Sequence, residues 1–202
     1  MGLIDSLIKD GWLKTPRIID AFRVVKRADF MPEEVKDFAE LDQAISIGRG
    51  QTISQPLTVA FMLEQLQPEP GDKILDVGSG SGWTSALLGR IVGTKGTVIA
   101  VEAIPELKEF GEQNAAKYNK GQVKFILGDG SKGYEKEAPF DRILCSAAAQ
   151  KEAPSAWKEQ LKIGGRIVTP VGSSIWLLVK KSAAEFEEIE HPGFAFVPLI
   201  EK

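Results

Sequence analysis

Residues 74–82 read Ile74-Leu75-Asp76-Val77-Gly78-Ser79-Gly80-Ser81-Gly82, and the prediction of the fold starts from them. A short apolar run, residues 73–77, enters a turn with three glycines, and a segment with apolar residues at helical spacing follows it. Glycine adopts backbone angles that other residues avoid, and it lets a ligand approach without meeting a Cβ atom. We therefore predict a buried strand, a ligand-binding turn and a helix, which together form the first βα unit of a parallel sheet.

Strand and helix patterns alternate through the rest of the chain. Further strands are predicted over residues 97–101, 123–127, 140–145 and 166–170, and helices over residues 105–118 and 153–161. This alternation is typical of parallel βαβ units, so we predict an α/β fold with a doubly wound, mostly parallel sheet of the Rossmann-like type. Residues 174–181 and 185–199 lack a helical pattern, and we expect them to form an antiparallel C-terminal edge.

The first 45 residues have a different pattern of apolar residues. Apolar residues recur at helical spacing around residues 3–8 and 18–25, and a third, weaker helical stretch follows Pro32. The length of 202 residues suits one domain with a sizeable core, and an apolar fraction of 43% is ordinary for a globular protein. We predict a single domain over 1–202, with a helical cap at 1–45 and an α/β core at 46–202.

Composition argues against several classes of protein. A formal charge of -3 and a pI near 5.4 disfavour a dedicated nucleic-acid binder, which usually shows a basic surface. The first residues are broken by charges, unlike a signal peptide, and no apolar run reaches the roughly 18 residues of a membrane helix. One cysteine and one histidine leave no disulfide pair and no zinc site. We expect a cytoplasmic monomer without a bound metal, a membrane partner or a nucleic-acid partner.

The glycine turn and the carboxyl end of the following strand together indicate which ligand binds. Glu102 follows Gly82 by twenty residues and ends the next strand, where its carboxylate is placed to accept hydrogen bonds from both ribose hydroxyls of an adenosine. A dinucleotide site usually has G-x-G-x-x-G, whereas here the third glycine comes one residue early. Asp76 would repel a pyrophosphate but suits a cationic ligand such as S-adenosylmethionine. A dinucleotide site and a purely structural turn remain alternatives.

The candidate cofactor residues lie at three successive strand ends. The Gly128-Asp129-Gly130 turn follows the third strand, and a short acidic loop there is placed to accept the adenine amino group, although Gly-Asp-Gly is often only a turn. The predicted set is Asp76, Gly78, Ser79, Gly80, Gly82, Glu102, Ala103, Gly128, Asp129 and Gly130.

A second motif lies before the glycine turn. It reads Gly48-Arg49-Gly50-Gln51-Thr52-Ile53-Ser54-Gln55-Pro56, followed by Ala60-Phe61-Met62. With this motif the sequence resembles the protein-L-isoaspartate (D-aspartate) O-methyltransferases, and the resemblance runs from about residue 15 to residue 199. Further matching segments are Leu75–Gly82, Ile104–Leu107, Gly128–Gly130, Ala138–Asp141, Gly164–Arg166, Pro170–Gly172 and Phe196–Leu199.

The resemblance implies an activity and an acceptor site. Members of this family use S-adenosylmethionine to methylate the carboxylate of isoaspartyl residues, and D-aspartyl residues as well, in damaged proteins. The acceptor is already ionised, so no strong base is needed, and positioning with exclusion of water supplies the catalysis. Ser54 matches the proposed active-site serine and, with Thr52, would orient the carboxylate. The substrate pocket implied by the resemblance includes Ile53, Gln55, Pro56 and Ala148.

The same residues have plainer explanations, and some depart from the family pattern. Thr-Ile-Ser-Gln-Pro also fits a helix N-cap with proline in the first turn. The loop 150–154 is longer and more polar than in relatives, and Arg49 stands where many have His or Phe. The sequence ends at Lys202, and we expect the cofactor to be more exposed than in relatives with a longer tail. A tRNA-adenine-type methyltransferase and a non-catalytic S-adenosylmethionine-binding module remain alternatives.

Overall fold

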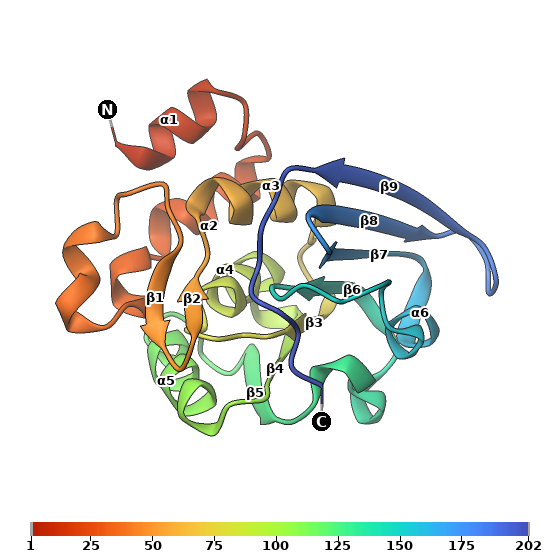
Figure 1. The fold of residues 1–202 in the computed structure, drawn as a ribbon. Helices are drawn as coiled ribbons and strands as arrows, with labels where there is room; N and C mark the ends of the chain where they lie inside the picture. The colour runs from red at the N-terminus through yellow and green to blue at the C-terminus, as the bar shows by residue number, and fades with distance from the viewer. Residues whose placement is uncertain (1, 202) are drawn as a thin grey trace.

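The structure, a computed structural model, describes residues 2–201 and contains a seven-stranded sheet with helices on both faces (Figure 1). The strand order is β5-β4-β3-β6-β7-β8-β9, and a separate two-stranded hairpin pairs β1 with β2. The N-terminal part comprises α1 (Leu3–Lys9), α2 (Pro16–Val24), the 3-10 helices η1 (Arg27–Phe30) and η2 (Glu33–Phe38), β1 (Ile45–Gly48), β2 (Gln51–Ile53) and α3 (Pro56–Leu66).

The α/β part begins at the strand that enters the glycine turn. It comprises β3 (Lys73–Val77), α4 (Trp83–Val92), η3 (Gly93–Lys95), β4 (Thr97–Glu102), α5 (Pro105–Ala116), β5 (Val123–Leu127), η4 (Gly130–Lys132), η5 (Glu135–Glu137), β6 (Phe140–Cys145), α6 (Ser155–Gln160), β7 (Leu161–Val171), β8 (Ser174–Lys180) and β9 (Phe186–Pro192). Strands β5, β4, β3, β6 and β7 pair in parallel, and β8 and β9 pair antiparallel. The predicted α/β fold with an antiparallel edge is therefore confirmed.

The side chains of β3, the central strand, alternate between the two faces of the sheet, and each face packs against its own apolar cluster. Ile74 of β3 belongs to a cluster with residues of α2, α3 and α4, whereas Leu75 and Val77 belong to a cluster with Trp157 of α6. Successive side chains of a strand point to opposite faces, so one buried strand supplies both clusters. Asp76 therefore lies on the same face as Ile74, beneath α4, which matters for the site below.

The predicted helical cap is part of the same packed structure. Leu7, Ile18 and Phe22 are buried in the cluster that also contains Leu63 of α3 and Leu87 of α4. Because one apolar cluster includes residues from both 1–45 and 46–202, we propose that the chain is a single domain. Within residues 2–201, every helix is too short or too polar to span a lipid bilayer.

Several elements differ from the sequence-based predictions. The β1–β2 hairpin was not predicted, because its strands are short and flank the glycine-rich tip 48–50. The stretch after Pro32 forms a 3-10 helix, and β7 begins at Leu161 and takes the last residue of the predicted helix 153–161. Beyond β9, the tail 193–200 forms only an isolated bridge, between Ala148 and Pro198, instead of a further strand.

Candidate active site

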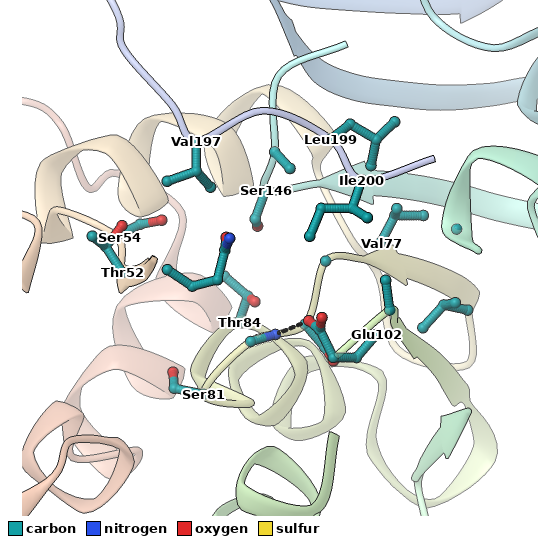
Figure 2. A pocket seen from close by; sticks show the side chains of 18 of the residues that line it. Thr52, Ser54, Val77, Ser81, Thr84, Glu102, Ser146, Val197, Leu199 and Ile200 are labelled. Atoms are coloured by element: carbon teal, nitrogen blue, oxygen red, sulfur yellow. Dashed lines mark hydrogen bonds between the residues drawn. The ribbon is translucent and has the colours of Figure 1, made fainter. Parts of the chain in front are cut away.

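A cavity opens at the carboxyl ends of β3, β4 and β6, beside the start of α4, as expected for a doubly wound sheet (Figure 2). Its volume is about 710 Å³, including the open mouth. We call it the donor cavity. It is lined by Gln51, Thr52, Ile53, Ser54, Val77, Gly78, Ser79, Gly80, Ser81, Trp83, Thr84, Val101, Glu102, Ala103, Gly130, Ser146, Ala147 and Val197–Ile200.

The glycine turn forms one wall of the donor cavity. The backbone N–H groups of Gly78 and Ser79 donate to the carbonyl of Val101 at 2.9 and 3.3 Å, which ties the turn to the end of β4. Gly78 and Gly80 have positive φ angles and lie on the cavity wall. The Ser79 hydroxyl is buried, and it has no hydrogen-bond partner among the described residues. A polar atom in this state is placed to bond a ligand.

Glu102 is the acidic group of the donor cavity. Its side chain is 6% exposed and lines the wall, and Figure 2 places it across the cavity from Thr52 and Ser54. Oε2 accepts a hydrogen bond from the Gly80 N–H at 2.8 Å, and Oε1 accepts one from the Ile104 N–H at 3.0 Å. A carboxylate oxygen can accept more than one hydrogen bond, so both oxygens of Glu102 retain capacity for a pair of ligand hydroxyls.

Asp76 does not line the donor cavity, although the sequence placed it among the cofactor residues. Its side chain is fully buried beneath α4, where the hydroxyls of Ser85 and Thr84 donate to Oδ2 at 2.6 and 3.3 Å. Burial raises the pKa of Asp76 to about 7, the two hydroxyls oppose this, and Glu102 adds to it. The reason is strand geometry, because residue 76 points into the helix layer beneath α4, whereas Val77, on the opposite face of β3, and the turn from Gly78 onward line the cavity.

Three further candidates also lie off the cavity wall. Gly82 has a packing role, because a Cβ atom there would come within 2.5 Å of the carbonyl oxygen of Gly111 on α5. The Asp129 carboxylate accepts hydrogen bonds from the N–H and hydroxyl of Ser131 and pairs with Lys132, so it shapes the 3-10 turn η4. Gly128 likewise does not line the cavity, whereas Gly130 does.

A second cavity, which we call the acceptor cavity, lies next to the first. It is lined by Ala44, Thr52, Ser54, Gln55, Thr58, Ser146 and residues 193–197. Four residues line both cavities, namely Thr52, Ser54, Ser146 and Val197. Among residues 2–201, none of those that line the acceptor cavity is charged, so hydroxyl and amide groups provide its polar contacts.

The Thr52–Pro56 segment is placed by packing around the start of α3. Pro56 is the first helical residue, and Gln55 occupies the N-cap position without a side-chain capping bond. The capping acceptor is Asp42, which accepts from the Leu57 N–H at 2.8 Å and from Gln55 Nε2 at 3.1 Å. This carboxylate occupies the helix N-terminus, so Ser54 is free of the capping role that its sequence also suggested.

Of the implied substrate residues, Gln55 lines the acceptor cavity and Ile53 lines the donor cavity, while Pro56 is buried behind them. Ala148 lines neither cavity. Its N–H donates to Val197 and its carbonyl accepts from Leu199, both at 2.8 Å, so it holds the tail in place.

The site residues predicted from the sequence included neither the C-terminal tail nor Ser146. Figure 1 shows the tail crossing the sheet end from β9, and Figure 2 shows Val197, Leu199 and Ile200 over the donor cavity. The tail therefore covers part of a site that we expected to be more exposed. Ser146 directly follows β6, so its position at the carboxyl end of a predicted strand could have marked it as a site residue.

The structure also shows where two departures from the family pattern lie. Residues 151–153 line a separate cavity with Lys158 and Trp176, not the donor or acceptor cavity. Arg49, at the hairpin tip, pairs with Glu106 of α5 at 2.9 Å, and both side chains are more than half exposed.

Comparisons with known proteins point to one family. The family model described as protein-L-isoaspartate(D-aspartate) O-methyltransferase matches residues 1–202. The protein-L-isoaspartate O-methyltransferase of Methanopyrus kandleri is 45% identical over 98% of this chain and 89% of its own length.

Two solved structures have similar folds. One protein-L-isoaspartate O-methyltransferase superposes with a TM-score of 0.88 at 26% identity, over 97% of this chain and 64% of that one. A Plasmodium falciparum structure, solved with S-adenosyl-L-homocysteine, gives a TM-score of 0.85 at 23% identity over 99% of this chain and 97% of that one.

Proposed function

Because the chain belongs to the protein-L-isoaspartate(D-aspartate) O-methyltransferase family, we propose that it methylates the carboxylate of isoaspartyl residues in damaged proteins, with S-adenosylmethionine as the donor. The observation that supports this most directly is the junction of two cavities at Thr52, Ser54, Ser146 and Val197. A methyl transfer requires donor and acceptor to meet in line, and this shared wall is a place where two ligands can touch.

The donor cavity suits S-adenosylmethionine. Glu102 is placed to accept from both ribose hydroxyls, and the glycine turn leaves room for close backbone approach. Ser79 Oγ and Trp83 Nε1 are buried and have no hydrogen-bond partner among residues 2–201, so both are available to the ligand. Ala103 and Gly130 complete the wall around the adenosine. When bound, S-adenosylmethionine supplies an electrophilic methyl group on a sulfonium centre.

The acceptor side requires orientation and no proton transfer. An isoaspartyl carboxylate is ionised at neutral pH, so its oxygen would bond to the methyl carbon while the bond from that carbon to the sulfonium sulfur breaks and S-adenosyl-L-homocysteine leaves, and no general base is needed. The Ser54 hydroxyl orients this carboxylate, and Thr52 stands beside it on the shared wall. Gln55 and Ile53 form the surrounding pocket, Pro56 fixes the start of α3, and Ala148 keeps the tail over the site.

The proposal extends to the oligomeric state, the partners and the location of the protein. The chain supplies both cavities by itself, which supports a monomer as the active form. The acidic balance, with 28 acidic against 25 basic residues, supports a protein acceptor without a nucleic-acid partner. The single cysteine is compatible with a cytoplasmic location. D-aspartyl residues are the second acceptor class.

The decisive experiment compares acceptors that differ only in their linkage. The protein is incubated with methyl-labelled S-adenosylmethionine and with isoaspartyl and aspartyl versions of one peptide. We expect base-labile methyl ester on the isoaspartyl peptide alone, because an ordinary aspartyl side chain does not present its carboxylate in the same place. Label on transfer RNA in a parallel incubation, or S-adenosylmethionine binding without any transfer to peptide, would overturn the proposal.

A further inference from the structure

Arg27 is a buried cation beside the acceptor site. It is the first residue of η1 in the N-terminal cap, and its side chain is 7% exposed. Burial lowers the pKa of Arg27 to about 10, against the attraction of Asp42 and Glu40, so the guanidinium stays protonated at neutral pH. Burying a charged group is costly unless its hydrogen bonds are replaced.

Backbone carbonyl groups provide these hydrogen bonds. Nη1 donates to the carbonyl oxygens of Ala39 and Leu41, each at 3.1 Å. Nη2 donates to the carbonyl of Gln43 at 2.7 Å and to the carbonyl of Ser54 at 3.1 Å. One rigid guanidinium therefore connects the loop 39–43 to the backbone of the residue that we place at the methyl-transfer junction.

The same guanidinium also contacts the wall of the donor cavity. Its central carbon lies 5.6 Å from the ring centroid of Trp83, within the range of a cation–π contact. Trp83 is buried, begins α4 and lines the donor cavity. Phe22 of α2 packs edge-on against the same ring at 5.6 Å and holds it in place. Arg27 therefore contacts both Trp83 of the donor cavity and Ser54 of the acceptor site.

Holding the loop alone does not require such a group. Leu41 is 43% exposed and Gln43 is exposed, and the bonds to their carbonyl groups are only part-buried, although the bond to the carbonyl of Ala39 is buried. Ser54 is different, because it is half-buried between the cavities and its hydroxyl position follows from its backbone. What the buried cation adds is a fixed distance between Ser54 and the wall at Trp83.

We propose that Arg27 is a positioning residue for the acceptor carboxylate, because it fixes the Ser54 backbone, and with it the Ser54 hydroxyl, relative to the donor cavity. This inference rests on the proposed function. It assigns to the N-terminal cap a part in the reaction, although the cap contributes few residues to either cavity wall.

The first test replaces Arg27 by methionine and, separately, by lysine, which keeps the charge but loses the fork of donors. We expect kcat/KM for the isoaspartyl peptide to fall at least tenfold in both variants, while the Kd for S-adenosylmethionine stays within threefold of wild type. Calorimetry of the same peptide with S-adenosyl-L-homocysteine present should show a similar loss of affinity without turnover. Unchanged peptide binding and unchanged kcat/KM would overturn the inference.

Arg17→Met is the matched control. Arg17 also lies in the cap and also binds a backbone carbonyl. Its Nε donates to the carbonyl of Pro68 at 2.7 Å, and its Nη2 donates to Gln67 Oε1 at 2.9 Å. These contacts lie at the far end of α3, away from Ser54. We expect this variant to lower the melting temperature but to keep the wild-type kcat/KM. An equal loss of activity in Arg17→Met would mean that any loosening of the cap impairs the enzyme, and would refute a specific role for Arg27.

A double-mutant cycle separates positioning from simple stabilisation. In the Ser54→Ala background, the further change Arg27→Met should lower kcat/KM by no more than twofold, since the hydroxyl that it positions is gone. Multiplicative effects would overturn the inference. If Arg27→Met does not fold at the assay temperature, the cycle is run with Arg27→Lys. Failure of the wild-type protein to methylate the peptide would count against the proposed function, whereas peptide binding with S-adenosyl-L-homocysteine still tests Arg27.

Discussion

Asparagine at position 76 should make the protein more stable at neutral pH. Asp76 is fully buried, and burial raises its pKa from 3.8 to about 7. Between these two pH values the folded state binds a proton that the unfolded state has already released. Stability therefore falls as pH rises through this window, because the unfolded state holds fewer protons than the folded state.

The size of the effect follows from the pKa difference. About three pKa units at 1.36 kcal/mol each give at most about 4 kcal/mol, absent below pH 4 and complete by about pH 8. Asparagine has nearly the same shape, cannot ionise, and still offers one oxygen to the hydroxyls of Ser85 and Thr84. The free energy of unfolding of Asp76→Asn minus that of wild type should therefore rise by up to about 4 kcal/mol between pH 4 and pH 8.

Urea unfolding followed by circular dichroism at several pH values measures this difference. Other titrating groups are common to both proteins and cancel. Ser85→Ala is the matched variant, because it removes a hydrogen bond that opposes the rise in the pKa of Asp76, and its loss of stability should extend to higher pH. Parallel stability curves for wild type and Asp76→Asn would show that Asp76 does not titrate in this window and would refute the reasoning.

Three further changes test the site and its supports. Glu102→Gln should weaken S-adenosylmethionine binding at least tenfold in calorimetry, because charged acceptors bond ribose hydroxyls more strongly; an unchanged Kd would contradict its role. Gly82→Ala should destabilise the protein by more than about 2 kcal/mol in chemical unfolding, since its Cβ meets the backbone of α5. Gly121→Ala, with a similar positive φ but open space, should cost only about 1–2 kcal/mol, and equal losses would refute the packing argument. Arg49→Ala should cost less than about 1 kcal/mol, and the loss should vanish at high salt, because its pair with Glu106 is exposed; a salt-independent loss would contradict this.

The glycine turn and the strand ends were predictable because their signals are local. A buried strand, a turn with closely spaced glycines and a helix follow one another within residues 73–92, and the chemistry of each is readable from its own residues. Glu102 was predictable for the same reason, since parallel strands end at one edge of the sheet and a carboxylate at the second strand end must lie near the turn.

The face of a side chain was less predictable than its position along the chain. Asp76 is next in sequence to Val77, which lines the donor cavity, yet its carboxylate points beneath α4 because strand residues alternate between faces. Gly82 and Asp129 stay predicted cofactor residues. Both lie in the predicted turns, and packing against α5 and the local hydrogen bonds of η4 also give each of them a structural role.

The sequence by itself determined the order of strands and helices, the donor turn and the acceptor motif, because hydrophobic period, glycine spacing and family pattern are properties of short segments. The segments that meet at the junction of the two cavities are far apart in sequence, and it is the tertiary structure that brings them together. Ser146 and Val197 reach Ser54 through sheet order and the tail bridge at Ala148, and Arg27 reaches it from the cap. Such contacts depend on the packing of the whole chain, so no short stretch of residues encodes them.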